Sequence, residues 1–159
     1  MISDLPLGRM FSFLTKQYIG VMAMSMKDTP IERYYFPLYL VGQNSGKISQ
    51  QELADKLLMD KVSLVRILDV LMNDGWIIRE VNPKDRRQHL LSITEKAKPW
   101  ITKIEENLQL TNEHFLSFLP ENQREPFVQM LQQLINSTKE LPIEEIELYY
   151  NRANEKQDK

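Results

Sequence analysis

Apolar residues recur at every third or fourth position along most of this chain, which is the spacing of helices that bury one face. The first such stretch covers residues 5–26, and its single apolar stripe consists of Leu7, Met10, Phe11, Leu14, Tyr18, Val21 and Met22. A second helix is expected from about residue 30 to residue 42, because residues 29–32 read Thr-Pro-Ile-Glu, a capping box with proline at the first helical position. Pro37 falls inside this helix and should kink it or shift its start.

Two short helices separated by a turn of a few residues are expected next. Residues 49–52 read Ser-Gln-Gln-Glu, a second capping box, and open a helix whose inward side chains are Leu53, Ala54, Leu57 and Leu58. Asp60 caps the following helix, whose buried stripe consists of Leu64, Ile67, Leu68 and Leu71. Gly75 suits the left-handed position that ends a helix. A short turn between two such helices is what a helix-turn-helix requires.

Two apolar-rich runs with β-branched residues, 76–81 and 89–93, predict a pair of strands joined by a charged loop at 82–88. The loop reads Asn-Pro-Lys-Asp-Arg-Arg-Gln, and its Asn-Pro start favours a turn. A helix pair followed by a basic hairpin is the layout of a winged helix-turn-helix. The predicted fold class is therefore mainly α with a small β-hairpin wing, flanked by N-terminal and C-terminal helices.

The rest of the chain predicts long helices. Thr94 should cap one helix over about residues 95–118, and Pro120 should break it before another at about 121–139. A further amphipathic stretch covers residues 143–150.

This order predicts three segments. They are N-terminal helices in 1–46, a winged domain in 47–94, and C-terminal helices with a tail in 95–159. The flanking helices carry larger apolar faces than so small a central domain can bury. We therefore expect a second copy of the chain to cover them, which predicts a homodimer.

The charge of the chain is unevenly distributed. The formal net charge is -2, made of +1 in residues 1–46, +1 in residues 47–96 and -4 in residues 97–159. The middle of the chain is therefore close to neutral. Any affinity for nucleic acid must come from local geometry rather than from a broad basic face.

Composition restricts the class further. The chain has 159 residues and no cysteine, which excludes disulfides and thiolate metal sites. It has no apolar run near the ~20 residues that span a bilayer. Its start lacks the pattern of a signal peptide, and together these features predict a cytoplasmic protein.

The fourth predicted helix offers candidate contacts to DNA bases at Lys61, Val62, Ser63, Val65 and Arg66. If its leucine stripe faces inward, Val62 and Arg66 face outward near the N-terminal turn, the part that meets base edges in the major groove. Arg66 can bind guanine or a phosphate, Ser63 can donate to either, and Val62 can contact a thymine methyl group. The alternative is that Lys61 and Arg66 are ordinary solvated charges.

Two further groups of residues suit the DNA backbone. Ser49, Gln50 and Gln51 lie at a helix N-terminus, where backbone N–H groups can bind a phosphate, although plain capping is also part of their role. The loop brings together the candidate wing residues Lys84, Asp85, Arg86, Arg87 and Gln88. Such a loop can reach phosphates or a narrow minor groove, and the carboxylate can hold one arginine in a bidentate pair. The alternative is a solvated hairpin.

Other classes of function receive less support. His89 and His114 stand apart, and the chain has no Gly-rich phosphate loop or nucleophile motif, so no enzyme activity, metal or cofactor is expected. A winged-helix adaptor that binds proteins is the alternative function, although such an adaptor has no need of the loop cations. A pocket for a small aromatic effector could be lined by Tyr18, Tyr34, Tyr35 and Trp76, together with Phe36. Aromatic residues at helical spacing are more often plain core.

These residues resemble the MarR family of bacterial transcriptional regulators over roughly residues 7–138. The specific parts are residues 60–71, the Gly-Trp pair at 75–76, and the run 82–87 that leads to Leu91, Ile93 and Thr94. The family's wing carries Asp-x-Arg, present here as residues 85–87, followed by a strand that ends in Leu-Thr, here Ile-Thr.

The resemblance implies an obligate homodimer with intertwined terminal helices and two winged domains on a pseudo-palindromic operator. It implies that Arg87 enters the minor groove, that Asp85 supports an arginine, and that a small aromatic or phenolic ligand releases the DNA in many members. The chain departs from the family at Val65, where Ser or Thr is common, at Val70, where a basic residue is common, and at Pro37. It also extends beyond the common length after residue 140, and its lack of cysteine excludes regulation by thiol oxidation.

Overall fold

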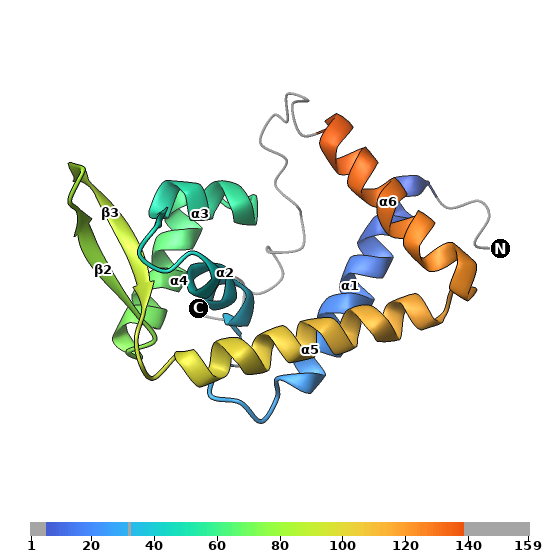
Figure 1. Cartoon of the computed structure of the whole chain (residues 1–159), viewed down its shortest axis with the longest axis horizontal. Coiled ribbons are helices and arrows are strands. Elements are labelled where there is room, and N and C mark those ends of the chain that lie inside the picture. Colours follow the sequence, from blue (N-terminus) through green and yellow to red (C-terminus); the bar gives the residue numbers. More distant parts are fainter. Residues whose placement is uncertain (1–5, 32, 139–159) are drawn as a thin grey trace, which may run out of the picture. The chain divides into compact units, whose positions relative to one another are not determined.

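The computed structural model describes residues 6–31 and 33–138, which fall into two units that divide between Phe118 and Leu119. The elements of the first unit are α1 (Leu7–Ser25), α2 (Tyr35–Gln43), β1 (Ile48–Ser49), α3 (Gln50–Leu57), α4 (Lys61–Asn73), β2 (Ile77–Asn82), β3 (Asp85–Ile93) and α5 (Lys98–Ser117) (Figure 1). The second unit contains α6 (Glu121–Thr138). The division falls inside the predicted segment 95–159, and the predicted boundaries after residues 46 and 94 stay predictions.

The second helix begins later than expected, because Pro37 shifts its start. α2 begins at Tyr35, so Pro37 lies in the first turn, where a missing N–H breaks no helical hydrogen bond. The expectation that Thr29 caps this helix is wrong. Its hydroxyl instead donates to the carbonyl of Met26 at 2.7 Å, just after α1.

The helix-turn-helix follows the predicted caps closely. The Ser49 hydroxyl accepts from the backbone N–H of Glu52 while the Glu52 carboxylate accepts from the Ser49 backbone N–H, so the capping box is complete. Asp60 caps α4 by accepting from the backbone N–H of Ser63 at 2.9 Å. Gly75 has the predicted left-handed backbone, with φ of +71°. One predicted inward position is wrong, because Leu58 is 89% exposed.

The hairpin belongs to a three-stranded antiparallel sheet in the order β1-β3-β2. Strand β1 is absent from the sequence prediction, since it is only two residues long and pairs Ile48 with Leu91 and Ser49 with Leu90. Strand β3 begins at Asp85 rather than at residue 89. The predicted loop 82–88 is therefore mostly strand, and the turn itself is only Pro83 and Lys84.

The start of α5 also differs from the prediction. The helix begins at Lys98 after a turn over residues 94–97, and Thr94 is not its cap. The Thr94 hydroxyl donates to the carbonyl of Gly75 at 2.8 Å, which ties the end of β3 to the end of α4. α6 matches the expected helix, and its side chains are exposed or only partly buried. The predicted amphipathic stretch 143–150 lies outside the described residues.

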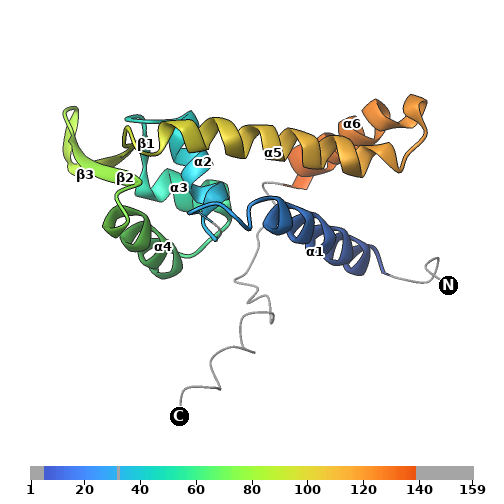
Figure 2. The ribbon, with the colours of Figure 1, turned by 90° about the horizontal axis from the view of Figure 1, so that it is seen from below.

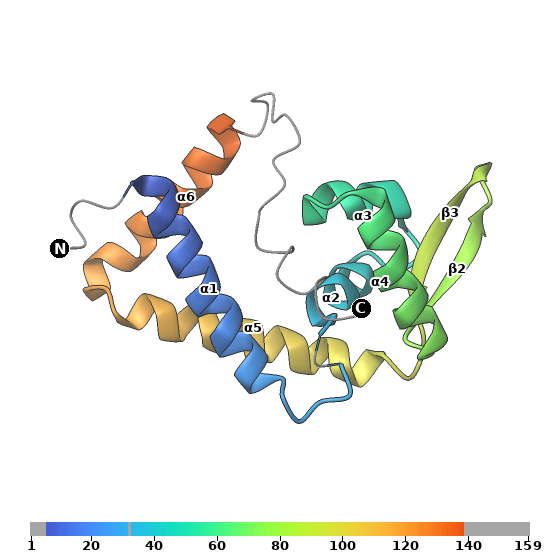
Figure 3. The same cartoon turned by 180° about the vertical axis from the view of Figure 1, so that it is seen from behind.

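Helix α5 packs against both α1 and α2 and joins them to the winged part of the first unit (Figures 2 and 3). The core consists of the buried residues Met22, Met26, Ile31, Leu38, Val41, Ile48, Leu53, Ala54, Leu64, Leu68, Leu71, Trp76, Ile77, Leu91, Ala97 and Ile104. At the α1–α5 contact, Thr111 and Asn107 donate to the sulfur atoms of Met22 and Met26 at 3.1 and 3.2 Å. A single core therefore holds the helix-turn-helix on the long helix.

The contact between α2 and α5 leaves no room for a side chain at Gly42. A Cβ atom there would lie 2.6 Å from the Cδ1 atom of Ile101. We predict that Gly42→Ala lowers the free energy of unfolding by about 1 kcal/mol, since overpacking costs about 1–3 kcal/mol and the helical preference of alanine returns part of it. Gly8→Ala is the matched control, because a Cβ atom there meets nothing within 4 Å. Urea unfolding would contradict this account if Gly42→Ala were no less stable than Gly8→Ala.

Candidate nucleic-acid interface

The N-terminal half of α4 exposes a mixed polar and apolar face. Burial of Leu64, Leu68 and Leu71 turns the opposite side of the helix to solvent. Lys61 and Arg66 are exposed there, Val62 is 64% exposed, and Ser63 and Val65 are partly buried. The five predicted contact residues thus surround one helix end, next to the Asp60 cap. This end offers two cations, one hydroxyl and an apolar surface.

The start of α3 lies beside the sheet. Ser49 is buried, and its hydroxyl is occupied in the capping box, so its side chain is not free to bind a ligand. Gln51 is exposed and donates to the Asp55 carboxylate at 2.8 Å. The Gln50 side-chain oxygen accepts from the guanidinium of Arg79 on β2 at 3.1 Å. An exposed arginine is therefore placed directly over the N-terminus of α3.

Arg79 is a candidate contact that the sequence pattern does not reveal. It lies in the predicted strand 76–81, where alternation indicates only an outward side chain. Its partner Gln50 is 29 residues away in the sequence, so no local pattern links them. The only available signal is that an outward arginine sits on the strand that leads into the basic loop.

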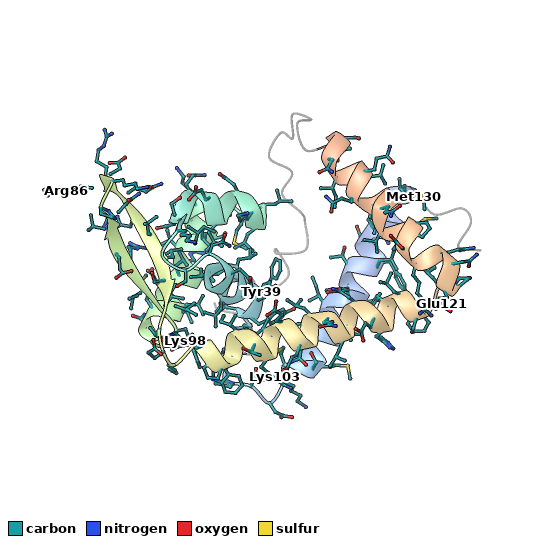
Figure 4. The ribbon with its side chains drawn as sticks, viewed as in Figure 1. Tyr39, Arg86, Lys98, Lys103, Glu121 and Met130 are labelled. Atoms are coloured by element: carbon teal, nitrogen blue, oxygen red, sulfur yellow. The ribbon has the colours of Figure 1, made fainter. Side chains whose placement is uncertain are left out.

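The β2–β3 hairpin holds the remaining cations away from the core. The strand register pairs Val81 with His89 but Asn82 with Asp85, so β3 has three extra residues, 86–88, between these two pairs. Such a bulge bends a strand and redirects its side chains. Lys84, Arg86 and Arg87 are all exposed, and Figure 4 places Arg86 at the outer end of the hairpin.

Asp85 organises the tip. Its carboxylate accepts from the backbone N–H of Arg87 at 3.0 Å and lies 3.4 Å from the Nε atom of the same residue. The side chains thus share one long contact rather than a bidentate pair. The Asn82 side chain accepts from the backbone N–H of Lys84 at 2.9 Å and donates to the side chain of Gln88. Hydrogen bonds within the turn fix the backbone while the Arg87 side chain, 93% exposed, stays free to bind.

The predicted aromatic residues form two separate groups. Tyr34 and Trp76 line a hollow of about 250 Å³, together with Ile31, Arg33, Leu71 and Asp74. Tyr18 lies elsewhere in the first unit and donates to the Asn112 side chain at 2.7 Å. Burial, and then the proximity of Tyr35, raises the pKa of the Tyr18 phenol, and burial also raises the pKa of Tyr35. Of the four residues, Tyr34 and Trp76 share this hollow, and a pocket formed by all four stays a prediction.

Other kinds of site receive no support within the ranges that the structure covers. Residues 6–31 and 33–138 contain no cluster of three His, Asp or Glu side chains that could hold a metal ion. His89 is exposed on β3. The ring centroid of His114 lies 5.1 Å from that of Phe118. No helix in these ranges is long and apolar enough to cross a membrane.

Two capped helices joined by a short turn, followed by a hairpin on a three-stranded sheet, define a winged helix-turn-helix protein. The sequence pattern of the MarR family matches residues 37–88, from α2 to the hairpin. Over these residues, about one third of its length, the chain is similar to the MarR family.

A known protein is also similar in sequence. A Thauera aromatica protein assigned as a transcriptional regulatory protein for the hcr operon is 28% identical over 108 residues, which are 68% of this chain. The matched region spans 64% of that relative's own length, less than two thirds.

Solved structures share the fold. A MarR transcriptional regulator from Methanosarcina mazei Go1 is 23% identical with a TM-score of 0.76, over 86% of this chain and 98% of that one. A MarR family protein from Listeria monocytogenes, complexed with 26mer DNA, is 21% identical with a TM-score of 0.75, over 84% and 89%. The transcriptional repressor CouR, bound to a 23-mer DNA duplex, is 23% identical with a TM-score of 0.70, over 84% and 94%.

The capping box of α3 makes a prediction about stability and pH. Hydrogen bonds from the Ser49 hydroxyl and then its backbone N–H lower the pKa of Glu52. A carboxyl whose pKa is lowered by folding contributes stability above its unfolded pKa and loses it as pH falls through the folded pKa. We predict that Ser49→Ala lowers the free energy of unfolding by about 1 kcal/mol at neutral pH.

The difference between Ser49→Ala and the unaltered protein should shrink as the pH falls from the ordinary pKa of glutamate through the lowered pKa of folded Glu52, because below the lowered pKa Glu52 is neutral in both proteins. Urea unfolding at neutral and acidic pH measures it. Ser117→Ala is the control, since that exposed hydroxyl only donates to the carbonyl of His114. A penalty that grows toward acid pH would contradict the role given to Glu52.

Proposed function

We propose that this chain is a homodimeric, sequence-specific DNA-binding transcriptional regulator that acts as a repressor and is released by a small-molecule effector. One observation carries the proposal. The exposed end of α4 and the exposed hairpin cations belong to one winged helix-turn-helix, whose core fixes α4 and the sheet to each other. Proteins that share this fold have been solved with bound DNA duplexes, which supports the same use here.

In this proposal each structural part has its own role in binding. The N-terminal turn of α4 enters the major groove, where Arg66 contacts guanine, Ser63 donates to a base or phosphate, and Val62 packs on a thymine methyl group. Lys61 and Val65 border this contact. The backbone at the start of α3, with the side chains of Gln50, Gln51 and Arg79, binds phosphates on one side.

The hairpin supplies the remaining proposed contacts to DNA. Arg87 enters the minor groove, where a narrow groove has a strongly negative potential. Lys84, Arg86 and Gln88 contact the adjacent backbone. Asp85 restrains Arg87 through the backbone N–H and the Nε atom, so that less side-chain freedom is lost on binding.

Dimerisation is proposed from apolar side chains that the single chain leaves exposed. The predicted stripe of α1 is only partly covered, because Met22 is buried whereas Leu7, Phe11 and Leu14 are 61%, 42% and 46% exposed. Within α6, the exposed apolar side chains are Val128, Met130, Leu134 and Ile135. A second copy would bury these faces and set two recognition helices about one DNA turn apart, roughly 34–36 Å.

Effector release is proposed at the hollow beside Tyr34 and Trp76. Leu71 and Asp74, at the end of α4, form part of its wall. An aromatic molecule that packs against Trp76 would therefore press on the helix that carries Arg66. The Tyr18–Tyr35 group is better explained as packing, because Tyr18 is already hydrogen-bonded to Asn112.

A winged-helix adaptor that binds proteins is the second candidate. The exposed valine at the end of α4 would suit it, but the three exposed cations around the hairpin tip favour a polyanionic partner. DNA-binding measurements on variants of the two elements distinguish the candidates.

The first variant tests the hairpin. Arg87→Ala should weaken binding to an operator duplex strongly, because it removes one cation per subunit from the interface without touching the core. The slope of log K against log salt should become shallower by about 0.9 for each phosphate that is no longer neutralised. Fluorescence anisotropy over a salt series measures both, and Lys103→Ala, an exposed cation on α5, is the matched control. If Arg87→Ala and Lys103→Ala bind alike, the minor-groove role is wrong.

The second variant tests the recognition helix. Arg66→Ala should lose more affinity for the operator than for a random duplex, because a bidentate contact to guanine is worth about 1–3 kcal/mol of discrimination. Anisotropy with both duplexes measures the ratio. Equal losses on the two duplexes would make Arg66 a phosphate contact instead.

A further inference from the structure

Helix α3 ends in a backbone conformation that normally calls for glycine. Leu58 has φ of 50° and ψ of 45°, and among the described residues it is the one non-glycine residue with positive φ. The conformation is fixed by hydrogen bonds from the Leu58 N–H to the carbonyl of Asp55 at 3.2 Å and from the Met59 N–H to that of Ala54 at 3.0 Å. Glycine adopts this geometry freely, whereas the Cβ atom of leucine is strained in it.

Within residues 6–31 and 33–138, this side chain gains almost no packing in return. Leu58 is 89% exposed, whereas Leu53 and Ala54 of the same helix are 0% and 2% exposed. A strained leucine that does not pack stabilises neither the helix end nor the core. Backbone outliers of this kind gather at functional sites. We therefore expect the benefit of the side chain to lie in a contact that the described residues do not make.

The position of Leu58 indicates where that contact is made. It precedes the Asp60 cap by two residues, so it lies at the end of α4 that carries the exposed Val62. Leu58 and Val62 thus lie on either side of the Asp60 cap along the chain. In the proposed complex, this helix end is the part that enters the major groove.

Charged residues lie on both sides of Leu58 along the chain. Lys56 and Lys61 are exposed on either side of Leu58 along the chain. Asp55 accepts from the Gln51 side chain and Asp60 from the Ser63 backbone N–H, and these neutral donors hold the two carboxylates in place without removing their charge. An apolar side chain between two lysines suits a partner that is both anionic and locally apolar. In the major groove of DNA that apolar group is the C5-methyl of thymine.

We propose that Leu58 is a specificity-determining residue that contacts a thymine methyl group in the operator, one base step from the thymine contacted by Val62. The inference rests on the proposed DNA-binding function. It explains why a leucine occupies a position that glycine would fill without strain. The operator should then carry two thymines, each recognised by its methyl group, in each half-site.

The test uses the full chain and a duplex that it selects from genomic DNA. Each thymine of a half-site is replaced singly by uracil, which removes only the methyl group, and affinity is measured by anisotropy. For the unaltered protein, uracil should weaken binding about fourfold at two positions, the value of one buried methyl group at each. Leu58→Gly should be insensitive to uracil at one of them and Val62→Ala at the other.

Thermal unfolding separates this role from a structural one. Leu58→Gly should unfold at an unchanged or higher temperature, by up to about 4 °C, because it relieves the strain. Ile78→Ala, which truncates an exposed apolar side chain on β2, is the control and should keep both uracil effects. A lower unfolding temperature for Leu58→Gly would place its side chain in the core, and a weaker dimer would place it between subunits. Either result overturns the inference.

The proposal and the proposed function can fail separately. If the unaltered protein binds no duplex, the DNA-binding function is wrong. If it binds and Leu58→Gly keeps both uracil effects, only the inference about Leu58 is wrong.

Discussion

The inward face of α4 determines most of what the molecule can do at its surface. Leu64, Leu68 and Leu71 are buried, and no other rotation of the helix would bury all three. Burial of these leucines places Arg66 and Val62 on the outer face of α4, whatever contacts those two side chains make themselves. The same core contains Trp76, the residue just before β2, so the direction of the hairpin is set together with that of the helix. The groups proposed to contact bases and the DNA backbone are therefore held in a fixed relation mainly by apolar burial.

Features governed by neighbouring residues could be predicted from the sequence. The caps at Ser49 and Asp60 act within one helical turn, and both lie where the pattern places them. Features governed by distant partners could not be predicted. Strand β1 exists because Ile48 pairs with Leu91, and Arg79 gains its position from Gln50. Thr94 has a good capping side chain, but its hydroxyl bonds to the end of α4 instead.

In the candidate site, too, some features could be predicted from neighbouring residues and others depend on distant partners. Its residue types and their order are visible in the chain, since an outward arginine and a cationic loop need only periodicity and charge. The state of each side chain is not visible there. The Ser49 hydroxyl is occupied by its own capping partner, Tyr18 donates to Asn112, and Tyr34 lines a hollow together with Trp76. Spacing alone predicts Leu58 to be in the core, although the helix has already ended there.

The three extra residues in β3 have a consequence for how such a hairpin can change over generations. Residues 86–88 lie between two fixed pairs, Val81 with His89 and Asn82 with Asp85. A residue gained or removed between these pairs would be absorbed locally, and the pairing nearer the core would keep its partners. Length and charge at the tip can thus vary without a compensating change in the hydrophobic pattern of the strands. At this point of the chain the properties of the tip can therefore change while the fold stays the same.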